Sequence, residues 1–144
     1  MQTFRPYSDF VKTAQCLDNR RLNNQINEAK VIYDVVTGRA LTSSWRNHPA
    51  VRMWRGNAVA LAYYHATLIM EWQFVRQKRN TRHVLTAYMP EIMEKPEWNE
   101  ILPKWFNNLD FFIAHRSNLI RKLPEHYKPM WPDVPDNLPY IWPV

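Results

Sequence analysis

The stretch that decides the fold is DNRRLNNQINEAKVIYDVVTG, residues 18–38. Its apolar side chains recur at spacings of four, three, four and three residues, the period of one face of an α-helix. They are Leu22, Ile26, Ala29, Tyr33 and Val36. Asp18 is a suitable N-cap, and Thr37-Gly38 is a suitable helix end. The pattern therefore predicts a helix over residues 18–37.

Helical signals also flank this stretch. Residues 8–16 predict a short helix that Ser8 caps. After a polar loop at 39–48, Pro49 fits the first turn of a long helix over about 50–78. His65 lies within the apolar stripe of that helix, a position typical of a core histidine rather than of a catalyst. Two short helices are expected near 82–88 and 97–102, and a last one over 108–122.

Prolines are concentrated in the C-terminal part, where six of the 11 lie between residues 124 and 143. That density excludes a regular helix or a central strand. Trp131, Tyr140 and Trp142 nevertheless make this part too apolar for a free tail. With only two glycines in the chain, tight hairpins are also disfavoured. We therefore expect an all-α fold: a single compact helical domain over 1–144 with a proline-rich, ordered C-terminal coil.

The overall charge limits the class of partner. Lys and Arg number 19 against 13 Asp and Glu, a net charge of +6. Such a charge favours an anionic partner such as nucleic acid, although it also serves simple solubility. No apolar run reaches the roughly 20 residues that cross a bilayer, and no signal peptide is evident. A lone cysteine, Cys16, fits a reducing compartment. We expect a cytoplasmic protein, in a bacterial host cell or its nucleoid, with no membrane partner and no obligatory protein partner.

Several kinds of chemistry are disfavoured by missing motifs. The five histidines contain no pair spaced for a zinc site on a helix, and a single cysteine forms no C-x-x-C. The sequence has neither a glycine-rich phosphate loop nor a G-x-S-x-G nucleophile motif. We therefore expect no metal and no cofactor.

The first polar cluster lies on the 18–37 helix. Arg21, Gln25 and Glu28 share one strip at i, i+4 and i+7, and the strip continues into Ile32 and Val35. A polar strip that becomes apolar is expected at the rim of a cleft, where a carboxylate can act as an acid or base. The alternative is a structural network that joins Arg21 to Glu28.

Two further clusters could contact an anionic ligand. Around Trp45, Asn47 and His48, an aromatic ring could stack on a base while Arg52 and Arg55 hold phosphates. Trp54, within the same segment, is expected in the core. The second cluster contains His115 and Arg116 with Arg121 and Lys122. Its alternative is a solvated helix end.

These residues carry a family resemblance. Asn47-His48-Pro49 followed by Trp54, after a helix with Asp18 and Glu28, resembles the pyrimidine-dimer DNA glycosylase, or endonuclease V-like, family. Its short bacterial and phage branch is the most similar, through Met-Gln-Thr-Phe at residues 1–4, His115-Arg116-Ser117 and the Pro139-to-Pro143 segment. The branch resemblance extends over nearly the whole chain.

The resemblance implies a DNA glycosylase with AP-lyase activity on damaged or modified pyrimidines in double-stranded DNA. In that family the α-amine of the chain attacks C1′ of the damaged nucleotide and forms a Schiff base. β-Elimination then cuts the strand, and a helix carboxylate supports the chemistry. An α-amine ordinarily titrates at about 7.7–8.0, so a useful fraction is nucleophilic at neutral pH.

Carried over residue by residue, the resemblance assigns catalysis to Met1, Glu28, Asp18 and His48. Gln2 is large enough to block removal of the initiator methionine, so the amine is that of Met1, with Thr3 as the alternative after trimming. Glu28 is favoured over Asp18 as the key carboxylate, because Asp18 can instead cap its helix. The expected DNA contacts are Arg20, Arg21, Gln25, Trp45, Asn47, Arg52, Arg55, His115 and Arg116.

Two other functions remain open from the sequence. One is a non-catalytic nucleic-acid-binding module of the same fold, which would bind DNA or RNA without cleaving it. The other is a glycosylase for a hypermodified phage base, with the same amine chemistry and a different pocket.

Overall fold

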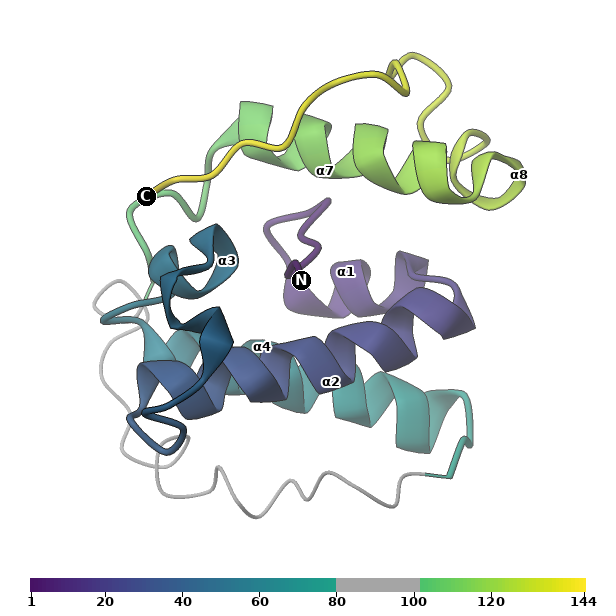
Figure 1. Ribbon diagram of the computed structural model, residues 1–144. Helices are drawn as coiled ribbons and strands as arrows, with labels where there is room; N and C mark the ends of the chain where they lie inside the picture. The colour runs from purple at the N-terminus through teal and green to yellow at the C-terminus, as the bar shows by residue number, and fades with distance from the viewer. Residues whose placement is uncertain (80–101) are drawn as a thin grey trace.

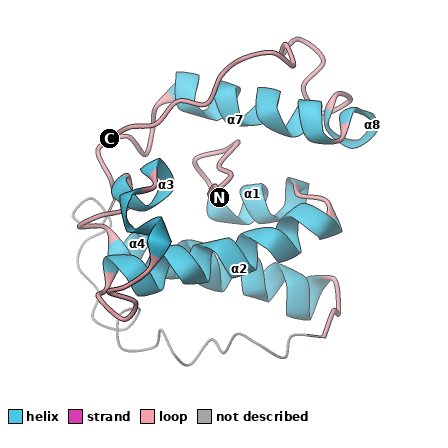
Figure 2. Ribbon diagram, viewed as in Figure 1, coloured by secondary structure: helices cyan, strands magenta, loops and turns pink. Residues whose placement is uncertain are grey.

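The computed structural model describes residues 1–79 and 102–144, which are helical and contain no strand (Figures 1 and 2). The elements in chain order are α1 (Phe10–Cys16), α2 (Asn19–Val36), the 3₁₀ turn η1 (Ser44–Asn47), α3 (Pro49–Arg52), α4 (Ala58–Met70), the π-helical turn η2 (Glu71–Val75), α7 (Leu109–Lys122) and α8 (Pro124–Tyr127). The expected all-α fold is confirmed. The two short helices expected near 82–88 and 97–102 lie outside the described residues, apart from residue 102.

Helix α2 forms where its apolar period predicted it. Asp18 caps it by accepting from the backbone N–H of Arg21, and Gly38 follows its end with a φ of 77°. That left-handed conformation is one that glycine adopts without steric cost. The apolar face of α2 packs against α4, and Leu22, Ile26 and their neighbours on that face are buried. Helix α1 is capped by Asp9, one residue beyond the expected Ser8.

The prediction of one long helix over about 50–78 is wrong, because the helix is interrupted between α3 and α4. Gly56 stands in the break with a φ of 78°, which a continuous right-handed helix cannot contain. The break turns the indole of Trp54 into the core, where it is fully buried and donates to Thr3 Oγ1 at 2.9 Å. His65 is also fully buried, as expected. Within the expected loop at 39–48, residues Ser44–Asn47 form η1.

The first residues of the chain pass through the interior between α2 and α7 (Figure 1). Residues 2–6 are all buried. Hydrogen bonds to two helices hold them: the Phe4 N–H donates to Gln25 Oε1 of α2 at 2.7 Å, and the Arg5 N–H donates to His115 Nδ1 of α7 at 2.8 Å. Because this N-terminal segment is part of the core, its first residue has a defined place in the fold.

Arg5 is a buried cation among aromatic rings. Its guanidinium lies 3.7 Å from the centroid of Phe106 and 5.1 Å from that of Phe10, and it donates to the carbonyl of Ser8 at 2.8 Å. Burial lowers the pKa of Arg5 to about 9, so the side chain stays charged at neutral pH. Cation–π contacts replace part of the solvation that it loses.

The C-terminal residues 128–144, here called the strap, run back along α7 as ordered coil (Figure 1). Leu138 anchors the strap: its N–H donates to Ser117 Oγ at 3.0 Å, and its carbonyl accepts from Arg121 at 2.7 Å. The expected proline-rich coil is confirmed, with one difference. Pro124 starts the one-turn helix α8, because proline fits the first helical position. No helix in the described parts is long and apolar enough to cross a membrane.

Candidate active site

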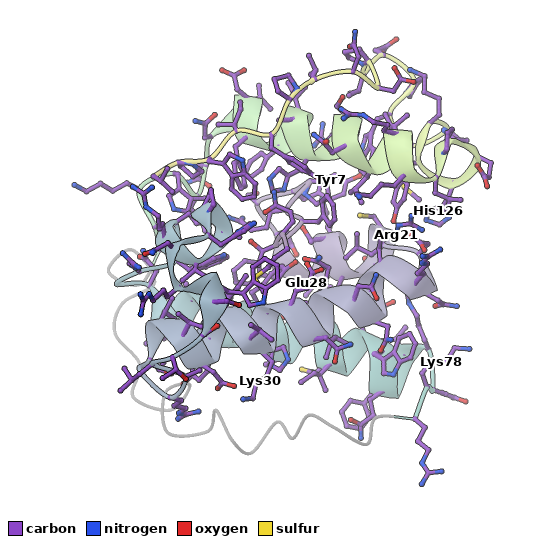
Figure 3. All side chains as sticks on the ribbon, in the orientation of Figure 1. Tyr7, Arg21, Glu28, Lys30, Lys78 and His126 are labelled. Atoms are coloured by element: carbon purple, nitrogen blue, oxygen red, sulfur yellow. The ribbon has the colours of Figure 1, made fainter. Side chains whose placement is uncertain are left out.

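Glu28 lies in the middle of α2, half-buried, and extends towards the N-terminal segment (Figure 3). Its Oε2 accepts from the backbone N–H of Gln2 at 2.9 Å and from Gln25 Nε2 at 3.2 Å. Two donors on one oxygen fix the orientation of the carboxylate. The hydrogen bond to Gln2 also places the carboxylate one residue away from the α-amine of Met1.

A cleft of about 330 Å³ opens where the N-terminal segment meets α2. Side chains from α2, α7 and the strap line it together with the first residues of the chain. They are Met1, Gln2, Phe4, Arg20, Arg21, Asn24, Gln25, Glu28, Lys122 and Tyr140. The cleft therefore combines an amine and a carboxylate with a cationic side and aromatic surface.

His48 is the N-cap residue of α3. Its Nδ1 accepts from the N–H of Ala50 at 3.1 Å, so the neutral ring carries its proton on Nε2. Burial lowers the pKa of His48, and the amino group of Met1 lowers it further, whereas Glu28 raises it. His48 therefore lies within electrostatic range of both Met1 and Glu28.

Aromatic rings continue from His48 in both directions. Trp45 packs edge-on against it with centroids 5.4 Å apart, and Trp142 of the strap does so at 5.7 Å. Tyr140 lies 5.6 Å from Trp142 and reaches the cleft. Trp45 is 43% exposed, so part of its ring remains available to a base.

Asp18 has a structural place outside the cleft. Its carboxylate caps α2 and accepts from the Tyr127 hydroxyl at 2.5 Å and from Arg21 at 3.4 Å. Burial alone would raise the pKa of Asp18, but these hydrogen bonds and the charge of Arg21 outweigh it, and the pKa is lowered. The choice of Glu28 over Asp18 as the carboxylate in the cleft agrees with this arrangement.

Two of the expected DNA contacts lie in the interior instead. Gln25 is 1% exposed, and partners within the fold occupy both ends of its amide. His115 is fully buried, and burial, followed by the charge of Arg5, lowers its pKa to about 3. His115 is therefore a neutral acceptor for the N-terminal segment and adds no charge to a surface. Both side chains are buried where they accept hydrogen bonds from the N-terminal segment, a contact that has no local signal in the sequence.

The other expected contacts differ in exposure. Arg116 is half-buried and donates to the carbonyl of Pro6 at 2.9 Å, so its guanidinium braces the N-terminal segment. Arg21 pairs with Asp18 and donates to the carbonyl of Lys122, which differs from the Arg21–Glu28 network considered as the alternative. The remaining contacts are exposed: Arg20, Trp45, Asn47, Arg52 and Arg55.

Sequence reasoning did not connect Glu28 with several residues from other segments of the chain. Gln2, Lys122 and Tyr140 line the cleft, and Trp142 packs on His48. They come from both termini and from α7, so no spacing in the sequence joins them to Glu28. The cluster of aromatic residues between the strap prolines was the available signal, and it indicated burial without naming a partner.

A model of the pyrimidine dimer DNA glycosylase family matches residues 1–88 of this chain. The chain belongs to that family. No curated protein and no solved structure gives a significant match. As a member of a glycosylase family, the chain is broadly a DNA glycosylase, and DNA is its substrate.

The matched residues hold the centre of the site. Met1, Glu28 and His48 all lie within residues 1–88, whereas Lys122, Tyr140 and Trp142 lie beyond them. The family match therefore covers the amine and the carboxylate, but not the wall that α7 and the strap contribute. Among residues 1–79 and 102–144, no three potential ligand side chains are grouped as a metal ion would require.

Proposed function

We propose that this glycosylase removes a damaged or modified pyrimidine and cuts the DNA strand by AP-lyase chemistry, with the Met1 α-amine as nucleophile. One observation carries the proposal: the N–H of Gln2, the residue after the amine, donates to Glu28 Oε2 at 2.9 Å. An amine and a carboxylate held this close form a nucleophile with its own proton acceptor.

In the first step the α-amine of Met1 displaces the base from C1′ of the nucleotide. The neutral amine forms a bond to C1′, and the bond between C1′ and the base breaks. The electron pair leaves with the base, which takes up a proton, while the amine loses a proton towards Glu28. The C1′–O4′ bond then breaks, and O4′ takes up the proton held by Glu28. The product is an iminium ion that joins the chain to the opened sugar.

Strand cutting follows from the iminium ion. It makes the C2′ proton acidic, and removal of that proton expels the phosphate from C3′. Water then hydrolyses the remaining iminium and releases the amine. The neutral His48, with its proton on Nε2, supplies a hydrogen-bond donor beside this centre. We assign that donor to the departing base or phosphate.

The aromatic and cationic residues around the cleft suit an extruded nucleotide. Trp45 offers a partly exposed ring against His48, and Arg20 lies on the cationic side of the cleft. Bases extruded from a duplex are commonly held by stacking, while their phosphates bind arginine or lysine. Arg52 and Arg55 are exposed at α3 and beyond it, where they can hold the flanking backbone.

The test is a cleavage assay on a panel of duplexes, each with one lesion or modified pyrimidine or with an abasic site. We expect base release followed by strand cutting on at least one pyrimidine substrate, and cutting of the abasic duplex. Sodium borohydride should convert the iminium ion into a stable protein–DNA adduct.

Two results would contradict the proposal. DNA binding that depends on salt but produces no cutting or adduct on any duplex would indicate a non-catalytic module. Base release without cutting or trapping would indicate a glycosylase that uses water instead of an amine. Activity confined to hypermodified bases would keep the mechanism and change the substrate.

A further inference from the structure

Gln25 occupies a position that neither DNA contact nor core packing explains. Its amide is 1% exposed and yet fully used. Nε2 donates to Glu28 Oε2 at 3.2 Å, and Oε1 accepts from the Phe4 N–H at 2.7 Å. One side chain therefore contacts both the carboxylate of the cleft and the segment that carries the amine.

Tyr64 completes this contact from α4. Its hydroxyl lies 2.9 Å from both Gln25 Oε1 and the Phe4 carbonyl, and its single proton serves one or the other. Burial raises the pKa of Tyr64 well above its ordinary value, so the hydroxyl keeps that proton. The Phe4 N–H, which can only donate, fixes which end of the Gln25 amide carries the oxygen, and the Tyr64 hydroxyl is a second donor to it. The NH₂ group is thereby directed to Glu28.

We propose that Gln25 is a positioning residue for the reaction: it sets the distance between the nucleophilic amine and Glu28 by holding both through one amide. The inference rests on the proposed function. Small displacements of reacting groups slow a reaction by large factors, whereas they alter substrate affinity little. Gln25 should therefore act on the chemical step and not on DNA binding.

The fold does not depend on Gln25 alone to hold the N-terminal segment. Trp54 donates to Thr3 Oγ1, and the Arg5 N–H donates to His115, independently of the amide. A change at Gln25 should therefore leave a folded protein in which the amine and the carboxylate are less well aligned.

The experiment compares two variants with the wild type. Gln25→Met removes both ends of the amide at similar length. Gln25→Glu keeps an oxygen for Phe4 and Tyr64 but loses the donor to Glu28. Single-turnover cutting of an abasic duplex at saturating enzyme gives the chemical rate, and a binding titration gives Kd. Thr13→Val is the matched control, because it deletes another buried hydrogen bond, from Thr13 Oγ1 to the Tyr7 carbonyl, away from the cleft.

We expect the chemical rate of both Gln25 variants to fall by about 10- to 100-fold at neutral pH with Kd unchanged. In Gln25→Glu the loss should shrink as the pH falls, because the introduced carboxyl regains a proton that it can donate to Glu28. A merely structural role would not produce that pH dependence. Thr13→Val should lower the melting temperature and keep the wild-type rate.

The outcomes separate the two proposals. An active wild type whose Gln25 variants cut at the wild-type rate would overturn this inference alone. The same holds if Kd rises while the rate at saturation is unchanged, since Gln25 would then be a DNA contact. A wild type that cuts no abasic duplex would overturn the proposed function.

Discussion

Glu28 is the residue on which the proposed chemistry depends most. One of its oxygens accepts two hydrogen bonds, from Gln2 and from Gln25, and the side chain remains half-exposed to the cleft. In Glu28→Gln an amide oxygen can still accept from Gln2, so the fold should be retained while the proton acceptor is lost. We expect a ~10²- to 10⁴-fold slower single-turnover rate, the range for loss of an acid–base group.

Asp34→Asn provides the control for that measurement. Asp34 lies on the same helix and pairs with Lys30 at 2.5 Å. Removing its charge should leave the rate unchanged. A Glu28→Gln protein that cuts DNA as fast as Asp34→Asn would show that the carboxylate takes no part in the reaction.

Trp45 should contribute to affinity and not to stability, because its ring is partly exposed at the edge of the site. Stacking of a base on an aromatic side chain is worth about 1–3 kcal/mol. Trp45→Ala is therefore expected to weaken binding of a lesion duplex by that amount and to leave the melting temperature nearly unchanged. Phe74→Ala, which removes another exposed ring at η2, should change neither the binding affinity nor the melting temperature. Equal binding by all three proteins would exclude Trp45 from the interface.

His115 makes the fold sensitive to acid. Its ordinary pKa of 6.5 applies to the unfolded chain, whereas burial lowers the folded value to about 3. Between pH 6.5 and pH 3 the unfolded chain binds a proton at His115 that the folded protein does not bind. The stability that depends on a neutral His115 is therefore fully present above pH 6.5 and is lost as the pH falls towards 3. Each pH unit in that interval costs up to about 1.4 kcal/mol. Urea unfolding at pH 7 and pH 5 should show a smaller loss for His115→Gln than for the wild type. Equal losses of unfolding free energy in the two proteins would show that groups other than His115 cause the acid sensitivity.

At the scale of elements, α2 was predictable and the α3–α4 break was not. The period of α2 agrees with its cap at Asp18 and its end at Gly38, so local and tertiary preferences coincide. In residues 50–78 the apolar period continues across Gly56, and periodicity therefore predicted one helix. The hydrogen bond from Trp54 to Thr3, 51 residues away in the sequence, belongs to the tertiary structure and has no local signal.

Substitutions of Gly56, which lies between α3 and α4, should lower the stability of the folded protein. Its φ of 78° is unfavourable for a residue with a Cβ, although no atom lies within 4 Å of the position that the Cβ would take. Gly56→Ala is thus expected to cost about 1–2 kcal/mol through the backbone alone. Gly56→Asn should cost less, because asparagine tolerates this conformation. Thermal unfolding measures the difference, and equal stability of all three proteins would contradict a strained position.

At the scale of the whole molecule, the site depends on contacts between distant parts of the sequence. The place of Glu28 and Arg21 beside the cleft was predictable, because one helix strip holds both. The roles of Gln25 and His115 were not, because each depends on the N-terminal segment passing through the core. Tyr140 and Trp142 reach the site only because the strap returns along α7.

The net charge of +6 should make DNA binding depend on salt. The logarithm of the binding constant should fall linearly with the logarithm of salt concentration, with a slope of about −0.9 for each phosphate neutralised. Arg20→Ala should reduce the steepness by about one such contact. Lys78→Ala should not, since Lys78, labelled in Figure 3, follows η2 and does not line the cleft. An equal salt-dependence slope for the two variants would show that Arg20 does not contact a DNA phosphate.

In the proposed mechanism, the chain attacks DNA with the amine of its N-terminal segment. The most direct test is to trap the adduct on an abasic duplex with borohydride, digest it and locate the modified residue by mass spectrometry. We predict that the sugar is attached to the α-amine of Met1. Attachment to the side chain of Lys122, the other amine that lines the cleft, would contradict the account.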